Sequence, residues 1–440
     1  MSPRFGTDGV RGEAFTYLTE SYVRALGAAA TTTFGTERLL IGRDTRESGP
    51  ALMRAFAEGC AVAGASIDDL GVVPTPAVAH MSAVHGIPAA MLSASHNPWA
   101  DNGIKLFAAG GRKLTDADQA LIEGSVLAHA DVAPIEPSMG HVSIEPYIQA
   151  VIDSVGGRRF DATRVVLDCA NGSAATTARA IFETLGADVV AIADQPTGRN
   201  INDGVGSTHP ENLVAAVEQH GAAVGFAFDG DADRVIACGP DGQLIDGDRI
   251  LAMGAIDRRD TGRLPHDTVV GTVMSNLGFR RAMQREGIEM VETAVGDRHV
   301  LEALDAGGYL LGGEQSGHII HRDLATTGDG VLTAVQLLDA ALRRGLAVGE
   351  WSASVMTSYP QVLENVRVTE AKPGFVDGLE GAIAAEQASL GDDGRILVRA
   401  SGTEPVIRVM VEASEQSTAA AVASRLADAV RLQAHPPSTD

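Results

Sequence analysis

Three stretches of the chain repeat one pattern of apolar and polar positions. Each begins with an apolar, β-branched run typical of a buried strand, crosses a loop that contains Gly or Asn, and continues with a helical periodicity. The stretches start at Arg38, Arg164 and Asp267, and in each a second apolar strand follows the helix. A glycine closes each helix, as expected of a C-terminal cap. These glycines are Gly64, Gly186 and Gly287. The pattern predicts three related α/β domains.

The pattern changes near residue 360. From there the order is strand, helix, two strands and a last helix, which predicts a smaller C-terminal α+β domain. A chain of 440 residues is also too long for one ordinary core. We therefore predict an α/β protein of four domains, with bounds 1–150, 151–252, 253–360 and 361–440.

Composition narrows the class of protein. With 45% hydrophobic and 21% charged residues the chain is globular, and a net charge of −23 argues against nucleic acid or an anionic membrane as a partner. A phosphorylated substrate would then need local arginines and backbone amides. The three cysteines make no CxxC pair and lie in apolar segments, which predicts buried free thiols in a reducing compartment. No apolar run resembles a leader or a membrane span, so we expect a cytoplasmic protein.

A cluster of carboxylates follows the predicted strand 224–228. In an extended segment alternate side chains face the same way, so Asp229, Asp231 and Asp233 should converge. Three carboxylates that close repel one another unless a cation lies among them, and all-oxygen ligands suit Mg²⁺ or Ca²⁺. An EF-hand is excluded because Arg234 and Pro240 stand where its Gly and Glu belong. The alternative is an acidic turn between two strands.

A serine ends another apolar run, in "MLSASHNPWADNGIK". Pro98 disfavours helical geometry at the residue before it, so we expect Ser95 on an extended loop just past a strand. A nucleophilic serine needs a base or a charged partner, and His96 and Lys105 are near in sequence. The alternative is an ordinary turn or capping serine.

The motif "RASGTEPVIRVMVE" predicts a phosphate site. Arg399 and Arg408 should lie on two adjacent strands, with Ser401, Gly402 and Thr403 between them. Glycine lets backbone amides approach a ligand, hydroxyls add donors, and arginine can bind a phosphate through two hydrogen bonds. The alternative is a plain hairpin with surface arginines.

The motif "LLGGEQSGHII" alternates a carboxylate, a hydroxyl and an imidazole. Glu314, Ser316 and His318 would share one side of an extended loop, where they could bind sugar hydroxyls or an amine. A polar strand edge explains the pattern equally well.

Two further stretches are candidate ligand loops. In "RFGTDGVRG", three glycines surround Thr7, Asp8 and Arg11, which indicates an anion-facing loop rather than a strand. In "VGDRHV", Asp297 and Arg298 are better explained as part of a solvated loop.

Together the motifs "FGTDGVRG", "SASHNP…NGIK", "FDGDADR", "VGDR", "GEQSGH" and "RASGTEPVIRVM" resemble, in type and in order, those of the α-D-phosphohexomutases over essentially the whole chain. The resemblance implies four domains around a central cleft, each with one motif. It also implies one Mg²⁺ per subunit, a phosphoserine at Ser95 and a sugar 1,6-bisphosphate as activator. The phosphoryl group would pass from Ser95 to the sugar, and the bisphosphate would turn over and return its other phosphate.

The resemblance also assigns roles to residues. Ser95 would carry the phosphoryl group, and Asp229, Asp231 and Asp233 would hold Mg²⁺ together with a phosphate oxygen on Ser95. The candidates for proton transfer and charge stabilisation would be Lys105, Arg11, His96 and His318. His318 would also belong to the substrate-binding set. Substrate-binding candidates are Thr7, Arg234, Asp297, Arg298, Glu314, Ser316, His318, Arg399, Ser401, Gly402, Thr403 and Arg408.

The chain departs little from the family pattern. Ala232 stands where a Gly is frequent, and His299 where a Tyr is frequent, and neither change touches the predicted chemistry. Gln315 favours the branch that acts on a phosphorylated amino sugar, with Glu314 as the candidate partner of the ammonium group. The alternatives are the same mechanism on glucose or mannose phosphate, a Mg²⁺-dependent phosphatase, and a non-catalytic sensor. The sequence leaves the oligomeric state open, a homodimer included.

Overall fold

The structure is a computed structural model that describes residues 3–6, 9–368, 374–401 and 405–434. It divides into two compact units. The first comprises Met1–Met274 and Glu286–Val355, and the second comprises Ser275–Arg285 and Met356–Asp440. Among the described residues, three mixed sheets lie in the first unit and one antiparallel sheet lies in the second. The predicted three α/β domains and one α+β domain are therefore confirmed.

The first sheet has seven strands in the order β1-β5-β4-β2-β3-β7, with β6 beside β5. Its strands are β1 (Val10–Glu13), β2 (Arg38–Arg43), β3 (Ser66–Val72), β4 (Ala89–Leu92), β5 (Asp101–Ala108), β6 (Arg112–Lys113) and β7 (Met139–His141). Its helices are α1 (Glu20–Phe34), α2 (Gly49–Val62), α3 (Thr75–His85), α4 (Asp116–Val126) and α5 (Glu145–Asp153). The prediction that the N-terminal motif forms no strand is wrong for β1. Val10 is fully buried, and β1 satisfies its backbone by pairing antiparallel with β5.

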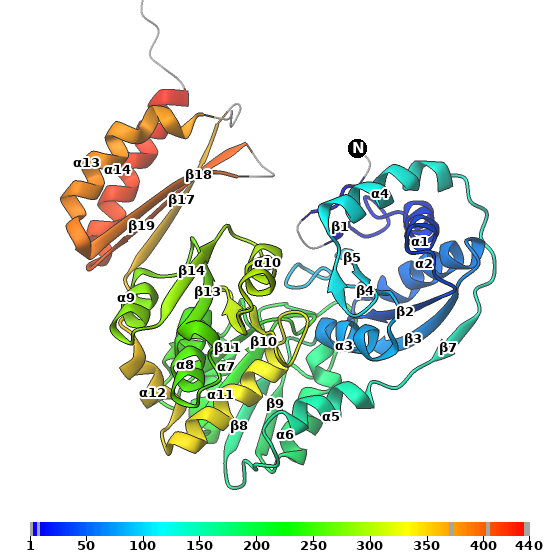
Figure 1. Ribbon diagram of the computed structural model, residues 1–440, viewed down its shortest axis with the longest axis horizontal. Helices are drawn as coiled ribbons and strands as arrows, with labels where there is room; N and C mark the ends of the chain where they lie inside the picture. Colours follow the sequence, from blue (N-terminus) through cyan, green and yellow to red (C-terminus); the bar gives the residue numbers. More distant parts are fainter. Residues whose placement is uncertain (1–2, 7–8, 369–373, 402–404, 435–440) are drawn as a thin grey trace, which may run out of the picture. The chain divides into compact units, whose positions relative to one another are not determined.

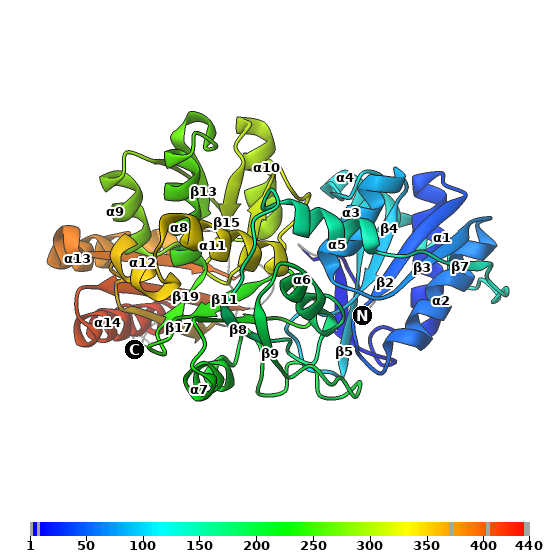
Figure 2. The ribbon, with the colours of Figure 1, turned by 90° about the horizontal axis from the view of Figure 1, so that it is seen from below.

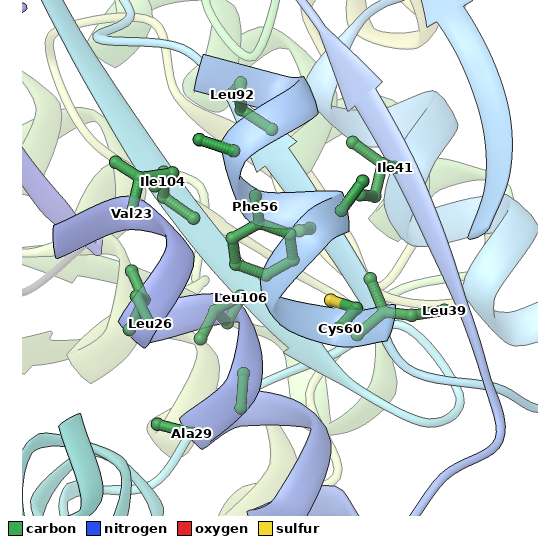
Figure 3. Close-up of a cluster of buried hydrophobic side chains, with 14 of the residues drawn as sticks. Val23, Leu26, Ala29, Leu39, Ile41, Phe56, Cys60, Leu92, Ile104 and Leu106 are labelled. Carbon is green, nitrogen blue, oxygen red and sulfur yellow. The ribbon is translucent and has the colours of Figure 1, made fainter. Parts of the chain in front are cut away.

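Alternation along β2 explains how helices cover both faces of this sheet. Leu39 and Ile41 face a core that includes Phe56 of α2, and all three side chains are fully buried (Figure 3). Gly42 faces the other side, where an added Cβ would lie 2.5 Å from the Val78 side chain of α3. Figures 1 and 2 show α1 and α2 side by side on this part of the molecule. Cys60 packs in the same core, and all three cysteines are buried free thiols, as predicted.

The second and third sheets repeat this plan on a smaller scale. The second has the order β12-β11-β10-β8-β9 and the third β14-β13-β15-β16. Their strands are β8 (Arg164–Asp168), β9 (Asp188–Ile192), β10 (Val224–Phe228), β11 (Val235–Cys238), β12 (Leu244–Ile245), β13 (Thr268–Thr272), β14 (Glu289–Thr293), β15 (Leu311–Gly313) and β16 (Ile319–His321). Their helices are α6 (Ala178–Thr184), α7 (Glu211–His220), α8 (Gly247–Asp260), α10 (Asp297–Gly307), α11 (Gly330–Arg344) and α12 (Val348–Val355).

The three sheets share one feature that places the functional loops. In each, a strand with a parallel neighbour turns directly into an antiparallel partner: β4 into β5, β10 into β11, and β15 into β16. The connecting loops 93–100, 229–234 and 314–318 carry the predicted serine, carboxylate and sugar-binding motifs. Ligands bind preferentially at the carboxyl ends of strands in such sheets.

The second unit contains the antiparallel sheet β17-β19-β18 and two long helices. Its elements are β17 (Gln361–Arg367), α13 (Glu380–Leu390), β18 (Gly394–Ala400), β19 (Val406–Ala413) and α14 (Gln416–Ala434). Helix α9 (Leu277–Arg285), which lies within the predicted third domain, packs with this unit. Fully buried Glu412 explains this, because its carboxylate accepts from the Leu277 amide at 3.0 Å and from Arg395 Nε at 2.9 Å.

Two predicted domain bounds fall inside helices. The bound at 150 cuts α5, and the bound at 252 cuts α8, whereas the bound at 360 directly precedes β17. The natural bounds therefore lie in the loops before α5 and before α8. Within the described part of the chain, no helix is both long and apolar enough to cross a membrane.

Asp329, which caps α11, gives the fold a pH dependence that can be measured. Its carboxylate accepts from the Leu332 amide at 2.9 Å and from the Tyr147 hydroxyl of α5, and burial raises its pKa to about 7. Because this folded-state pKa lies above the unfolded value, the contribution is full below about pH 4 and is lost as the pH rises through 7. We expect wild type to lose on the order of 3 kcal/mol between pH 4 and 8 relative to Asp329→Asn.

The difference in Tm between the two proteins, followed by calorimetry in EDTA, measures this effect. Tyr147→Phe serves as a control, because loss of a hydrogen bond that favours the ionised carboxylate should move the midpoint to higher pH. Parallel Tm curves for wild type and Asp329→Asn would contradict the expectation.

Candidate active site

Ser95 lies at the centre of the site. It is 1% exposed, and its Oγ donates to Asp229 Oδ2 at 2.6 Å and lies 3.3 Å from His96 Nδ1. The predicted extended conformation is wrong, because Ser95 has φ +52° within a turn closed by the Asn97 amide and the Ala94 carbonyl at 3.1 Å. A left-handed residue other than glycine is strained, and such strain is typical of functional positions.

The three aspartates converge as predicted, but by a different geometry. One carboxylate oxygen from each of Asp229, Asp231 and Asp233 lies within 4.8 Å of the others, and all three residues are buried. The segment is a tight turn rather than an extended strand: the Ala232 amide donates to the Asp229 carbonyl at 3.0 Å, and Ala232 has φ +57°. This angle explains why glycine is frequent in the motif and why alanine can replace it only with strain.

The donor set fits a hard divalent cation. Asp231 Oδ1 and Asp233 Oδ1 are buried and accept no hydrogen bond from the described residues. Buried carboxylate oxygens without donors are costly unless a cation binds them. Burial, together with the charges of Asp233 and Asp231, raises the pKa of Asp229 well above its usual range. A divalent cation would remove this cost, because it stabilises the ionised form of all three groups.

Lys105 supplies positive charge to the same cluster. Its Nζ donates to Asp231 Oδ2 at 2.7 Å and to Asp233 Oδ2 at 3.0 Å, and its side chain is 3% exposed. Burial alone would raise the pKa of Asp233, but Lys105, His318 and Arg234 together hold it well below its usual range. Burial, followed by the charges of Arg234 and Arg11, lowers the pKa of His96 to about 4. The site therefore holds a neutral imidazole and an ammonium group beside Ser95.

A cavity of about 380 Å³ adjoins these groups. The candidate residues that line it are Arg11, Asp233, Arg234, Asp297, Glu314 and His318. The side chains thus include two guanidinium groups for an anion and carboxylates for a cation or for hydroxyls. The buried Nε2 of His318 forms no hydrogen bond within the described residues and lies 3.7 Å from Asp297 Oδ2.

The loop 314–318 is not extended, so it does not present Glu314, Ser316 and His318 on one side as predicted. The Gly317 amide donates to the Glu314 carbonyl at 3.0 Å, which makes a turn and separates the side chains. Glu314 and His318 line the cavity, whereas Ser316 is exposed and is not among the lining residues. Glu314 Oε1 accepts from the Gly296 amide at 3.0 Å.

The motif that contains Asp297 begins a helix, so the predicted solvated loop is wrong. Asp297 is the first residue of α10 and is 8% exposed, because Lys113 contacts its carboxylate and His318 Nε2 lies 3.7 Å away. Arg298 forms ion pairs with Asp116 and, at 3.0 Å, with Glu302. Its guanidinium is thus engaged on the surface of the first unit rather than in the cavity.

The predicted phosphate motif lies in the second unit. Arg399 on β18 and Arg408 on β19 are direct cross-strand partners, as expected, and the Ser401 amide donates to the Val406 carbonyl at 2.8 Å. Burial and the neighbouring Arg408 lower the pKa of Arg399. Two like charges paired across strands are unfavourable by themselves, which suits an anion site. Gly402, Thr403 and Thr7 lie outside the described residues.

Several residues that complete the site belong to none of the predicted motifs. Thr75 at the start of α3 donates from Oγ1 to Asp231 Oδ2 at 2.5 Å, and Asn202 donates to the Ser95 carbonyl at 2.9 Å. Arg46 donates to the same carbonyl at 2.9 Å. Of these residues only Arg46 had a sequence signal, the polar run "DTRES" directly after β2.

Comparison with known proteins covers nearly the whole chain. Four phosphoglucomutase/phosphomannomutase domain families match in order: domain I at residues 2–132, domain II at 145–242, domain III at 246–359 and the C-terminal domain at 363–429. The chain is 49% identical to the phosphoglucosamine mutase of Thermobifida fusca, over 98% of each chain.

Two solved structures show the same fold. A phosphoglucomutase/phosphomannomutase family protein from Burkholderia thailandensis superposes with a TM-score of 0.80 at 24% identity, over 98% of each chain. The N-acetylphosphoglucosamine mutase of Aspergillus fumigatus, in complex with GlcNAc-6P and magnesium, gives 0.72 at 20% identity, over 99% of this chain and 96% of that one.

Proposed function

Because this chain belongs to the phosphoglucomutase/phosphomannomutase family, we propose that it interconverts glucosamine 6-phosphate and glucosamine 1-phosphate. The observation that carries the proposal is Ser95, whose buried hydroxyl lies 2.6 Å from a carboxylate of the aspartate cluster. A serine presented to three clustered carboxylates and a lysine fits a phosphoryl carrier, since phosphoryl transfer requires positioning and charge neutralisation.

One Mg²⁺ per subunit is the proposed cofactor. Asp229, Asp231 and Asp233 would hold it, together with an oxygen of the phosphoryl group on Ser95. Two buried carboxylate oxygens that accept no hydrogen bond from the part of the chain that the structure describes, Asp231 Oδ1 and Asp233 Oδ1, support this assignment. Bound there, the cation would neutralise charge on the transferring phosphoryl group.

Ser95 exchanges the phosphoryl group with both ends of the sugar. Starting from phosphoserine, the phosphoryl group moves from Ser95 Oγ to the C1 oxygen of glucosamine 6-phosphate, and the proton of the C1 hydroxyl passes to Ser95 Oγ. The 1,6-bisphosphate then turns over, and its 6-phosphoryl group returns to Ser95 Oγ while the proton of that hydroxyl passes to the C6 oxygen, which leaves glucosamine 1-phosphate. His96 Nδ1, 3.3 Å from Ser95 Oγ, is placed to carry this proton, and Lys105 and Arg11 stabilise the charge. A sugar 1,6-bisphosphate would install the first phosphoryl group.

The remaining candidates hold the substrate. Arg234 binds phosphate within the cavity, and Glu314 pairs with the ammonium group of the amino sugar. Asp297 and His318 bind hydroxyls. In the second unit Arg399, Ser401 and Arg408 bind the phosphate that is not transferred, together with Gly402 and Thr403. Thr7, Arg298 and Ser316 stay predicted substrate residues, although neither Arg298 nor Ser316 lines the cavity.

Substrate preference tests the proposal directly. Purified protein with Mg²⁺ and a trace of sugar 1,6-bisphosphate would receive glucosamine, glucose or mannose 6-phosphate, and phosphorus NMR would follow the 1-phosphate and free phosphate. We expect glucosamine 1-phosphate to form fastest. We expect Glu314→Gln to lower the ratio of the rate on glucosamine 6-phosphate to the rate on glucose 6-phosphate. If glucose or mannose is preferred, the assigned sugar is wrong. If free phosphate is the main product, the protein is a phosphatase.

A further inference from the structure

The loop that carries Ser95 directs several backbone carbonyls at one side chain. Arg46, whose side chain is fully buried, donates from Nη2 to the Ser95 carbonyl at 2.9 Å and to the Asn97 carbonyl at 2.8 Å. Its Nη1 donates to the Asp101 carbonyl at 2.9 Å and also contacts the Pro98 carbonyl. One guanidinium group therefore binds three carbonyls within loop 93–100 and the first carbonyl of β5.

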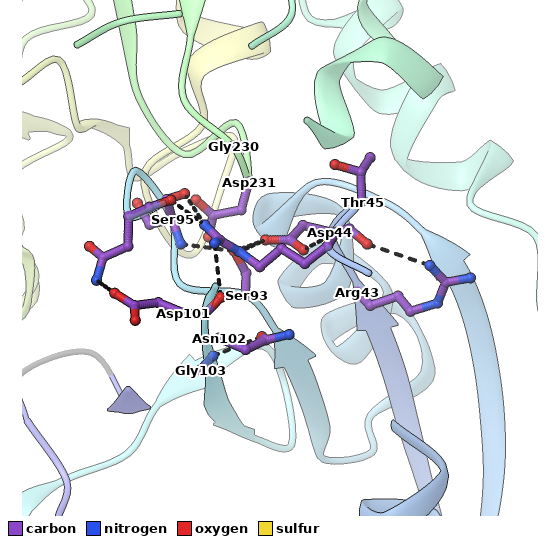
Figure 4. Close-up of polar contacts among 12 residues, drawn as sticks. Arg43, Asp44, Thr45, Ser93, Ser95, Asp101, Asn102, Gly103, Gly230 and Asp231 are labelled. Atoms are coloured by element: carbon purple, nitrogen blue, oxygen red, sulfur yellow. Dashed lines mark hydrogen bonds and ion pairs between the residues drawn. The ribbon is translucent and has the colours of Figure 1, made fainter. Parts of the chain in front are cut away.

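Asp44, the carboxylate that pairs with Arg46, holds the same loop through the backbone amide of Ser95. Asp44 pairs with Arg46 Nε at 2.9 Å and accepts from Ser93 Oγ at 2.6 Å. Ser93 Oγ in turn accepts from the Ser95 amide at 2.9 Å (Figure 4). The peptide groups on both sides of Ser95 are thus fixed by one buried ion pair.

This fixation matters because of the backbone angle of Ser95. A residue with a Cβ at φ +52° is strained, so the loop would relax without such bonds. A relaxed φ would turn Oγ away from Asp229 Oδ2, which now lies 2.6 Å away. The Ser95 carbonyl also packs closely on the aspartate turn, since a Cβ at Gly230 would lie 2.6 Å from it.

We propose that Arg46 is a positioning residue for phosphoryl transfer: it holds Ser95 in the left-handed conformation that aims Oγ at the aspartate cluster. The inference rests on the proposed role of Ser95 as phosphoryl carrier. Arg46 touches no reacting atom, and it acts through the loop carbonyls. Lysine cannot replace it, because an ammonium group has three donors and lacks the planar fork that serves four carbonyls and a carboxylate at once.

Arg46→Lys tests the proposal, because it keeps the positive charge and removes the planar guanidinium group. We expect kcat to fall about 100-fold, as for a reacting group displaced by about 1 Å, with KM for the sugar phosphate within about twofold of wild type. The Mg²⁺-induced rise in Tm should persist, since Arg46 does not touch Asp231 or Asp233. Trp99 lies in the same loop, so in a Trp351→Phe background its fluorescence should become more accessible to acrylamide.

Arg258→Lys is the matched control for burial. Arg258 is 3% exposed and pairs with Asp323 at 2.9 Å, on α8 and outside the site. Its replacement should lower Tm comparably while leaving kcat and Trp99 fluorescence unchanged. Ser93→Ala, which frees the Ser95 amide, provides a milder second variant and should lower kcat about tenfold.

Two results would overturn the inference: Arg46→Lys with the kcat of wild type, or with a raised KM and an unchanged kcat. A different variant shows whether the proposed function itself is wrong. If Ser95→Ala retains turnover, Ser95 is not the carrier, whatever Arg46→Lys does.

Discussion

Ser95→Ala is expected to lower kcat for glucosamine 6-phosphate by at least about 10⁴-fold, because no other group can take the place of a covalent carrier. The substitution should lower the stability of the protein only slightly. Alanine removes one hydroxyl from a buried loop whose conformation is held by bonds to backbone groups of residue 95. Mg²⁺ should still raise Tm, since all three aspartates remain. Steady-state turnover and thermal melts with and without Mg²⁺ measure both effects.

Ser352→Ala is a matched control for this variant. Ser352 on α12 is equally buried and takes no part in the site, so its replacement should leave kcat within about twofold of wild type. Ser95→Ala with more than a few per cent of wild-type turnover would contradict the expectation, as would the loss of the Mg²⁺ effect.

Lys105→Met is expected to have opposite effects on metal binding and on catalysis. Removing a buried ammonium group from two carboxylates at 2.7 and 3.0 Å should destabilise the metal-free protein by about 3 kcal/mol. Mg²⁺ should restore most of this loss and bind more tightly than in wild type, because the competing cation is gone. Turnover should nevertheless fall at least about 100-fold, since charge on the reacting groups is no longer stabilised.

Calorimetry at several Mg²⁺ concentrations, beside steady-state kinetics, separates these effects. Arg258→Met removes another buried cation, and its loss of stability should not respond to Mg²⁺. Weaker Mg²⁺ binding in Lys105→Met would show that Lys105 supports the metal site instead of competing with it.

The local chemistry of the site was predictable because it is concentrated in short motifs. The strand before Asp229 and the convergence of the three carboxylates after it were predictable from an apolar run and the spacing of the acidic residues, although the segment is a turn rather than an extended strand. The same holds for the cross-strand pair Arg399 and Arg408, since two apolar runs around a glycine loop predict a hairpin.

Backbone angles were not predictable from these motifs. Nothing in the residue types of Ser95 or Ala232 indicates a positive φ, which is usually supplied by glycine or asparagine. Tertiary contacts impose both angles. For this reason an extended segment was expected where the chain forms turns, and Ser316 was expected beside Glu314 although a turn separates their side chains.

Contacts between distant parts of the chain also could not be predicted from the sequence. Arg46 meets the Ser95 carbonyl across 49 residues, Asn202 meets it across 107, and Thr75 meets Asp231 across 156. Each pair depends on how whole sheets pack, and neither partner carries a local pattern that identifies the other. The placement of α9 with the C-terminal sheet has the same cause, since Glu412 lies 135 residues from Leu277.

Transfer of a phosphoryl group to Ser95 and back is the most direct test of the account. Dephosphorylated protein would be mixed with glucosamine 1,6-bisphosphate and Mg²⁺, and intact and peptide mass spectrometry would locate the modification before and after a chase with glucosamine 6-phosphate. The account predicts one phosphoryl group on Ser95 that the chase moves onto the sugar, with no inorganic phosphate released. A protein that stays unmodified at Ser95, or whose phosphoryl group is lost to water, would contradict it.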